Sequence, residues 1–70
     1  ENMKSFEEFR KSIDQDTLNI WSDEIHKEVE ESLKDIKESD PDQYFFAFPQ
    51  TFSFKVSMRL LEAYHNWLNQ

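Results

Sequence analysis

Two carboxylate–histidine pairs, Asp23/His26 and Glu62/His65, are the residues of this 70-residue chain that are best placed to do chemistry. The members of each pair are three positions apart, so a helix would put them on one face. Helical bundles that hold two metal ions use this spacing, together with inward-facing carboxylates from neighbouring helices. Glu30 would add an oxygen one turn beyond His26. One hypothesis is therefore a homo-oligomeric metal-binding helical bundle.

A structural interpretation of the same pairs is simpler. The chain contains fifteen acidic residues, so carboxylates fall near both histidines by chance. Asp23 and Glu30 lie toward the solvent edge of the helix that their surroundings predict. His65 shares an apolar stripe with Leu61 and Leu68, where we expect a packed histidine with one hydrogen bond. We keep the metal site as an alternative and predict no cofactor.

Sequence signatures of enzymes are missing from the chain. It has no glycine, which rules out a glycine-rich phosphate loop, and no H-E-x-x-H metalloprotease motif. It has no cysteine, which excludes a cysteine nucleophile, a thiolate metal site and a disulfide. A chain of this length also leaves little room for a walled pocket. We predict that it is not an enzyme.

The formal charge of −7 is unevenly distributed along the chain. Residues 1–43 hold fourteen of the fifteen acids and six of the eight bases, whereas residues 44–70 are slightly basic. A phosphate backbone repels such a chain, so we expect no direct binding to nucleic acid. No apolar run approaches the ~20 residues of a membrane span. With no cysteine either, the expected location is the cytoplasm.

Two helices are predicted in the N-terminal half. Ser5 and Glu8 have the spacing of a capping box, which starts a short helix that ends near Ser12 or Ile13. A second helix, from about Gln15 to Glu38, follows a cap at Asp14 or Asp16. It carries one apolar stripe at three- and four-residue steps, formed by Leu18, Trp21, Ile25, Val29, Leu33 and Ile36. Pro41 ends it, because a proline disfavours helical geometry in the residue before it.

The segment Phe52–Leu60 alternates apolar and polar residues, which alone would predict a strand. A helical wheel from Pro49 to Gln70 separates polar from apolar residues better, and it accommodates the consecutive Leu60 and Leu61. We therefore predict an aromatic connector followed by a C-terminal helix from about Gln50 to Asn69. A hairpin that pairs residues 44–48 with residues 52–56 is the alternative.

These elements predict one all-α domain over residues 1–70, built as a small helical hairpin or three-helix bundle. The two longer helices are expected to pack antiparallel. The apolar arc of the C-terminal helix covers well over half its circumference, which is too wide for one neighbouring helix. A homodimer is therefore expected to complete the core. Ile20, on the polar side of the long helix, is predicted to be exposed.

Two surfaces are candidates for partner binding. One is an acidic helix face that would attract a basic protein and could mimic the phosphate backbone of a nucleic acid. It consists of Glu24, Glu28, Glu31, Asp35 and Glu38. The other is an aromatic surface for a partner or for self-association: Tyr44, Phe45, Phe46, Phe48, Phe52 and Trp67. The leading hypothesis is a small non-catalytic interaction module, an adaptor or inhibitor. A purely structural dimerisation domain is a further alternative.

Overall fold

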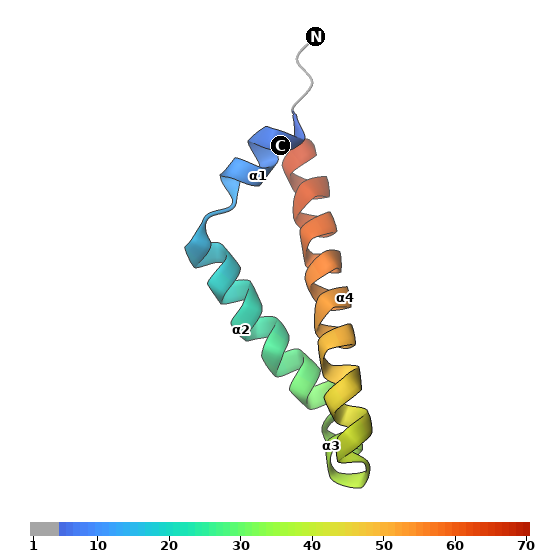
Figure 1. Cartoon of the computed structure of the whole chain (residues 1–70). Coiled ribbons are helices and arrows are strands. Elements are labelled where there is room, and N and C mark those ends of the chain that lie inside the picture. Colours follow the sequence, from blue (N-terminus) through green and yellow to red (C-terminus); the bar gives the residue numbers. More distant parts are fainter. Residues whose placement is uncertain (1–4) are drawn as a thin grey trace.

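The computed structural model describes residues 5–70, and helices are the one type of regular secondary structure over that range (Figure 1). Its four helices are α1 (Phe6–Ser12), α2 (Gln15–Ser32), α3 (Lys34–Ser39) and α4 (Pro41–Leu68). The all-α prediction is confirmed. The alternative hairpin is wrong, because both of its proposed strands lie inside α4.

Side-chain caps define the starts of the first two helices. The Ser5 hydroxyl accepts a hydrogen bond from the Glu8 backbone N–H at 3.1 Å, and the Glu8 carboxylate accepts one from the Ser5 N–H at 3.0 Å. This is the capping box that the sequence predicted. The Asp14 carboxylate accepts from the Thr17 N–H at 2.8 Å at the start of α2. That hydrogen bond favours the ionised carboxylate and lowers the pKa of Asp14.

The long helix predicted from Gln15 to Glu38 is interrupted at Leu33. This residue has φ −110° and ψ 11°, which ends α2 and begins α3 in a new direction. Just before it, the Ser32 hydroxyl donates to the Val29 carbonyl at 3.1 Å, a local hydrogen bond that competes with the helical ladder. These residues are helical as predicted, but the prediction of one continuous helix is wrong.

The prediction of an aromatic connector before Gln50 is also wrong, because residues 41–49 are helical. Helix α4 begins at Pro41 rather than Gln50, with the Asp40 carboxylate accepting from the Gln43 N–H at 3.2 Å. Pro41 occupies the first turn, where a missing N–H costs nothing. Pro49 lies inside the helix and cannot donate to the Phe45 carbonyl, yet the helix continues.

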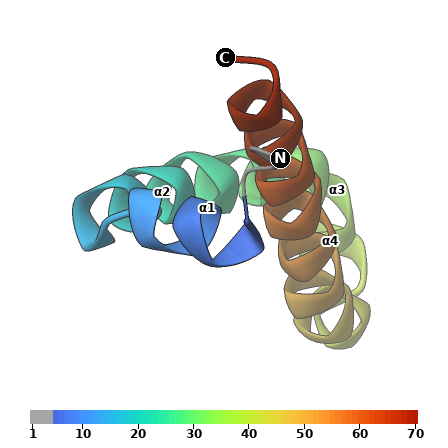
Figure 2. The same ribbon diagram turned by 90° about the horizontal axis from the view of Figure 1, so that it is seen from above.

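The four helices form an open, elongated arrangement of 55 × 20 × 16 Å. Helix α2 descends and α4 returns in the opposite direction, and the two diverge with distance from α3 (Figure 1). Seen from above, α2 crosses α4 at a wide angle (Figure 2). The opposite directions were predicted, but a compact three-helix bundle is not confirmed.

The core of the described residues is very small. Only Phe9, Ile25 and Val29 are buried, with 5, 1 and 0 % of their surface exposed. Ile25 and Val29 belong to the apolar stripe predicted for α2, whereas α4 contributes no fully buried residue. Most of the apolar surface of α4 is therefore at least partly open to solvent.

Helices α2 and α4 are also joined by charged groups. The Arg59 guanidinium lies 3.1 Å from the Glu24 carboxylate and 5.7 Å from the centre of the Trp21 ring. Lys55 lies 3.7 Å from Glu28. These contacts hold one side of α4 against α2.

A second contact closes the far end of the molecule. The Phe9 ring on α1 lies 5.0 Å from that of Tyr64 and 5.6 Å from that of Trp67, measured between ring centroids. Both partners belong to the C-terminal half of α4. Helix α1 is therefore held to the last turns of α4 by aromatic packing.

Candidate interaction surface

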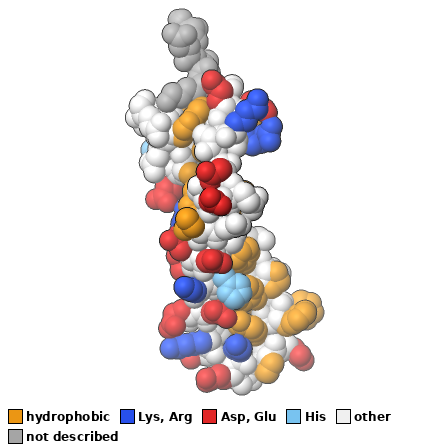
Figure 3. All heavy atoms as spheres, turned by 90° about the vertical axis from the view of Figure 1, so that its left-hand side faces the viewer, with side chains coloured by type: hydrophobic (Ala, Val, Ile, Leu, Met, Phe, Trp, Pro, Cys, Tyr) orange, Lys and Arg blue, Asp and Glu red, His pale blue; other side chains and the backbone are white. Residues whose placement is uncertain are grey.

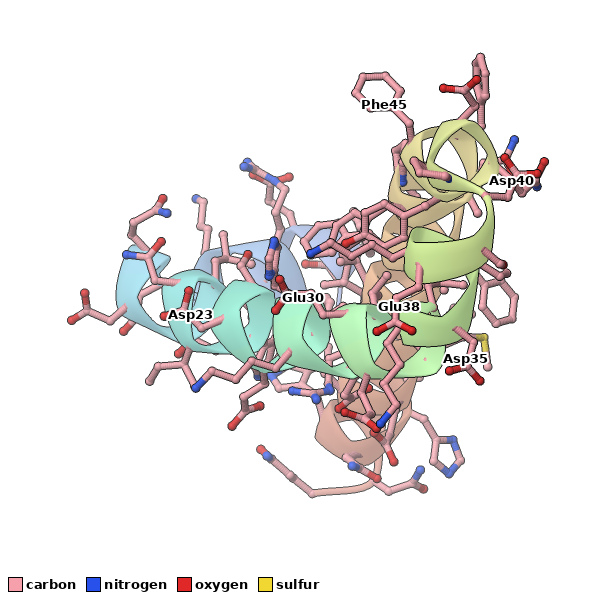
Figure 4. All side chains as sticks on the ribbon, turned by 90° about the horizontal axis from the view of Figure 1, so that it is seen from below. Asp23, Glu30, Asp35, Glu38, Asp40 and Phe45 are labelled. Carbon is pink, nitrogen blue, oxygen red and sulfur yellow. The ribbon has the colours of Figure 1, made fainter. Side chains whose placement is uncertain are left out.

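The structure divides the predicted aromatic surface into two groups. Phe45 and Phe46 have 77 and 69 % of their surface exposed, and their rings meet edge to face with centroids 6.4 Å apart. Figure 4 shows Phe45 pointing away from the helices. The other members are partly buried among neighbouring side chains: Tyr44, Phe48, Phe52 and Trp67. The exposed pair is available for a partner. Tyr44, Phe48 and Phe52 pack with one another on the same half of α4, whereas Trp67 packs against Phe9 at the other end of the helix.

A shallow hollow of about 360 Å³ lies beside Phe45, where α2 and α4 converge. We call it the end hollow, and its lining residues are His26, Glu30, Tyr44, Phe45, Phe48 and Pro49. The His26 ring lies 4.9 Å from the Phe48 ring, and Phe48 lies 5.7 Å from Tyr44, between centroids. Figure 3 shows hydrophobic side chains gathered beside a histidine in the lower part of the face it displays. The hollow can take an apolar side chain.

The polar groups of the end hollow are a histidine and a carboxylate. His26 Nδ1 and Glu30 Oε1 are 3.5 Å apart, and both side chains are about half exposed, at 54 and 48 %. A carboxylate next to an apolar hollow favours a ligand that carries a positive charge beside an apolar group. The chemistry of the hollow therefore matches a basic and apolar peptide segment.

The predicted acidic face is not uniformly available. Glu24 and Glu28 pair with cations of α4, as described above, and Glu31 pairs with Lys34 at 3.1 Å. Asp35 and Glu38 form no ion pair within residues 5–70. Both lie on α3 at the lower end of the molecule (Figure 4). Of the five acids of the predicted face, the two that are open to a partner therefore lie on α3.

The five residues proposed for a metal site are not brought together. Asp23, His26 and Glu30 lie on α2, and Glu62 and His65 lie on α4. Within residues 5–70, no three histidine, aspartate or glutamate side chains converge closely enough to hold a metal ion.

His65 itself is exposed, so the prediction of a packed histidine is wrong. Its stripe on α4 faces away from α2, the helix against which it would have packed. Its backbone carbonyl accepts a hydrogen bond from the Asn69 side-chain amide at 2.8 Å.

An exposed apolar row on the C-terminal half of α4 was not included among the predicted site residues. Phe54, Met58, Leu61 and Leu68 have 65, 50, 61 and 44 % of their surface exposed. The helical wheel placed them in the wide apolar arc, but it could not tell which part of that arc α2 would cover. Their spacing was the available signal, since it is that of a helix-packing seam.

Comparisons with protein-family models, with curated proteins and with solved structures find no match for this chain. No helix in the described part of the chain combines the length and the apolar character needed to cross a bilayer. Any function must accordingly be argued from the surfaces themselves.

Proposed function

We propose that the protein is a small non-catalytic interaction module that binds a basic segment of a partner protein at the end hollow. The observation that carries this proposal is the apolar hollow of α2 and α4, which has Phe45 exposed at its edge and Glu30 beside it. An apolar side chain of the partner enters the hollow, and a neighbouring Lys or Arg meets the Glu30 carboxylate.

Electrostatic attraction assists this encounter. The chain has a net charge of −7, and Asp35 and Glu38, which form no ion pair with any described residue, lie on α3 at the same end as the hollow. A field of this sign raises the association rate of a basic partner and weakens as salt is added. An adaptor or an inhibitor could both act in this way, and we propose the cytoplasm as the compartment.

Selection from a random peptide library displayed on phage tests the proposal. We expect the folded protein to enrich peptides that combine Lys or Arg with a large apolar residue. A synthetic peptide of that sequence should bind at least about tenfold more weakly to Phe45→Ser, as expected for truncation of an interface anchor. Added salt should weaken its binding to the unmodified protein.

The matched control is Phe54→Ser, which removes a phenyl ring of similar exposure, 65 % against 77 %, from the same helix but outside the end hollow. Circular dichroism should show unchanged helix content in both variants. Failure to enrich any peptide, or equal loss of binding in both variants, would contradict the proposal.

A further inference from the structure

We infer that the C-terminal half of α4 binds a second copy of this chain in an antiparallel orientation. The α4 seam consists of Phe54, Met58, Leu61, His65 and Leu68, which follow one another at steps of four, three, four and three residues. That spacing places them in one row along a helix and is the pattern by which two helices interlock their side chains. The inference is independent of the end hollow.

The seam lies on a side of the C-terminal half of α4 that the other described helices leave largely uncovered. Lys55 and Arg59 face α2, and Tyr64 and Trp67 face α1. On a helical wheel the α4 seam lies roughly 120° from each of these two sides. In Figure 1, α1 and α2 both lie to the left of this half of α4, and no described helix is drawn to its right.

The exposed area of the seam matches the needs of a small dimer interface. Its four apolar side chains are 44–65 % exposed, which leaves on the order of 400 Å² of apolar surface per copy. A patch of this area is comparable to the largest apolar patch of a typical monomer, which is often a functional surface. With two copies, and with His65 and the flanking residues, the contact reaches about 1,000 Å², which is the lower limit for a specific interface and is typical of a weak, reversible dimer.

The charge of the chain leaves the seam as the surface that best suits contact with a second copy. The four apolar positions of the seam carry no charge, whereas the chain as a whole has a net charge of −7. Two copies would repel one another across α2 or α3. The uncharged seam is the surface at which two such chains can meet with the least repulsion.

Charge also determines the orientation. Asp35, Glu38 and Asp40 gather at the lower end of the molecule, near the start of α4 (Figure 4). A parallel dimer would place these acidic ends side by side, despite the lysines at positions 34 and 37. An antiparallel dimer separates them and aligns the two helix dipoles favourably.

The antiparallel arrangement predicts specific neighbours across the interface. With the twofold axis midway between Met58 and Leu61, Met58 of one copy lies level with Leu61 of the other. Phe54 then lies level with His65, which pairs a large aromatic ring with a smaller one at each end of the contact. The twofold axis repeats both of these pairs, so the interface is self-complementary and the assembly stops at two copies.

Disulfide cross-linking of single-cysteine variants tests both the interface and its orientation, because the native chain has no cysteine. Phe54→Cys and His65→Cys are prepared separately, mixed in reduced form and oxidised. We expect a covalent dimer that contains one of each variant, identified by its mass. Each variant alone should cross-link several-fold less, since its two cysteines would lie about 16 Å apart along the axis, beyond disulfide reach.

The matched control is Asp23→Cys, an exposed position on α2 away from the seam. Circular dichroism of the reduced variants shows whether each retains the native helix content. Efficient cross-linking of each variant with itself would indicate a parallel dimer and overturn the inferred orientation. If the Phe54→Cys/His65→Cys mixture cross-links no more than the Asp23→Cys control, the interface itself is wrong.

Discussion

Replacing Ile25 by alanine tests whether the fold depends on the small core between α2 and α4. The Ile25 side chain has only 1 % of its surface exposed, so the substitution removes three buried carbons and leaves a cavity. Losses of this kind typically lower the free energy of unfolding by 2–5 kcal/mol, and we expect about 3 kcal/mol. A domain of this size, with three buried residues among positions 5–70, has little more stability than that to lose.

The same substitution at Ile20 is the matched control. Ile20 lies on the same helix but is 57 % exposed, as the sequence predicted. Ile20→Ala should change the free energy of unfolding by no more than about 0.5 kcal/mol, because the small loss of burial is offset by the better helix propensity of alanine. Urea unfolding followed by circular dichroism, at one protein concentration, measures both variants. Equal losses in the two variants would refute the core described here.

Three further results are expected. A double-mutant cycle with Arg59→Gln and Glu24→Gln should give a coupling of roughly 0.5 kcal/mol that shrinks with added salt, because the Glu24 side chain is 56 % exposed. Ser5→Ala removes one half of the capping box and should lower the free energy of unfolding by about 1 kcal/mol, measured in urea. The pKa of Asp14 is lowered in the folded state, so its stabilisation of α2 is present above the ordinary value of 3.8 and is lost as the pH falls through the folded pKa. An acid titration of helix content should show this loss, and Asp14→Ala should lack that component.

Local signals in the sequence predicted the helices well. The capping box at Ser5, the cap at Asp14 and the proline after Asp40 all mark helix ends in the structure. The period of the apolar stripe in α2 identified Ile25 and Val29, which are its two buried residues. These features depend on residues within one or two turns of each other, so the sequence contains them directly.

Features that depend on contacts between helices were not predictable in the same way. The change of direction at Leu33 and the passage of α4 through Pro49 depend on how the helices pack, because neither residue type requires that outcome. Likewise, the helical period of the apolar residues identified the whole apolar arc of α4, but it could not predict which part of that arc α2 covers. The α4 seam is defined by the packing of the helices, because Lys55 and Arg59 face α2 and leave the seam on another side of α4.

Light scattering coupled to size-exclusion chromatography tests most directly whether α4 presents an interface to a second copy. The measurement compares the unmodified protein with Leu61→Glu over a wide range of protein concentration. We expect the mass of the unmodified protein to rise from one chain to two with concentration, by mass action, while the variant retains the mass of one chain. A monomeric mass for the unmodified protein at every concentration would contradict the account.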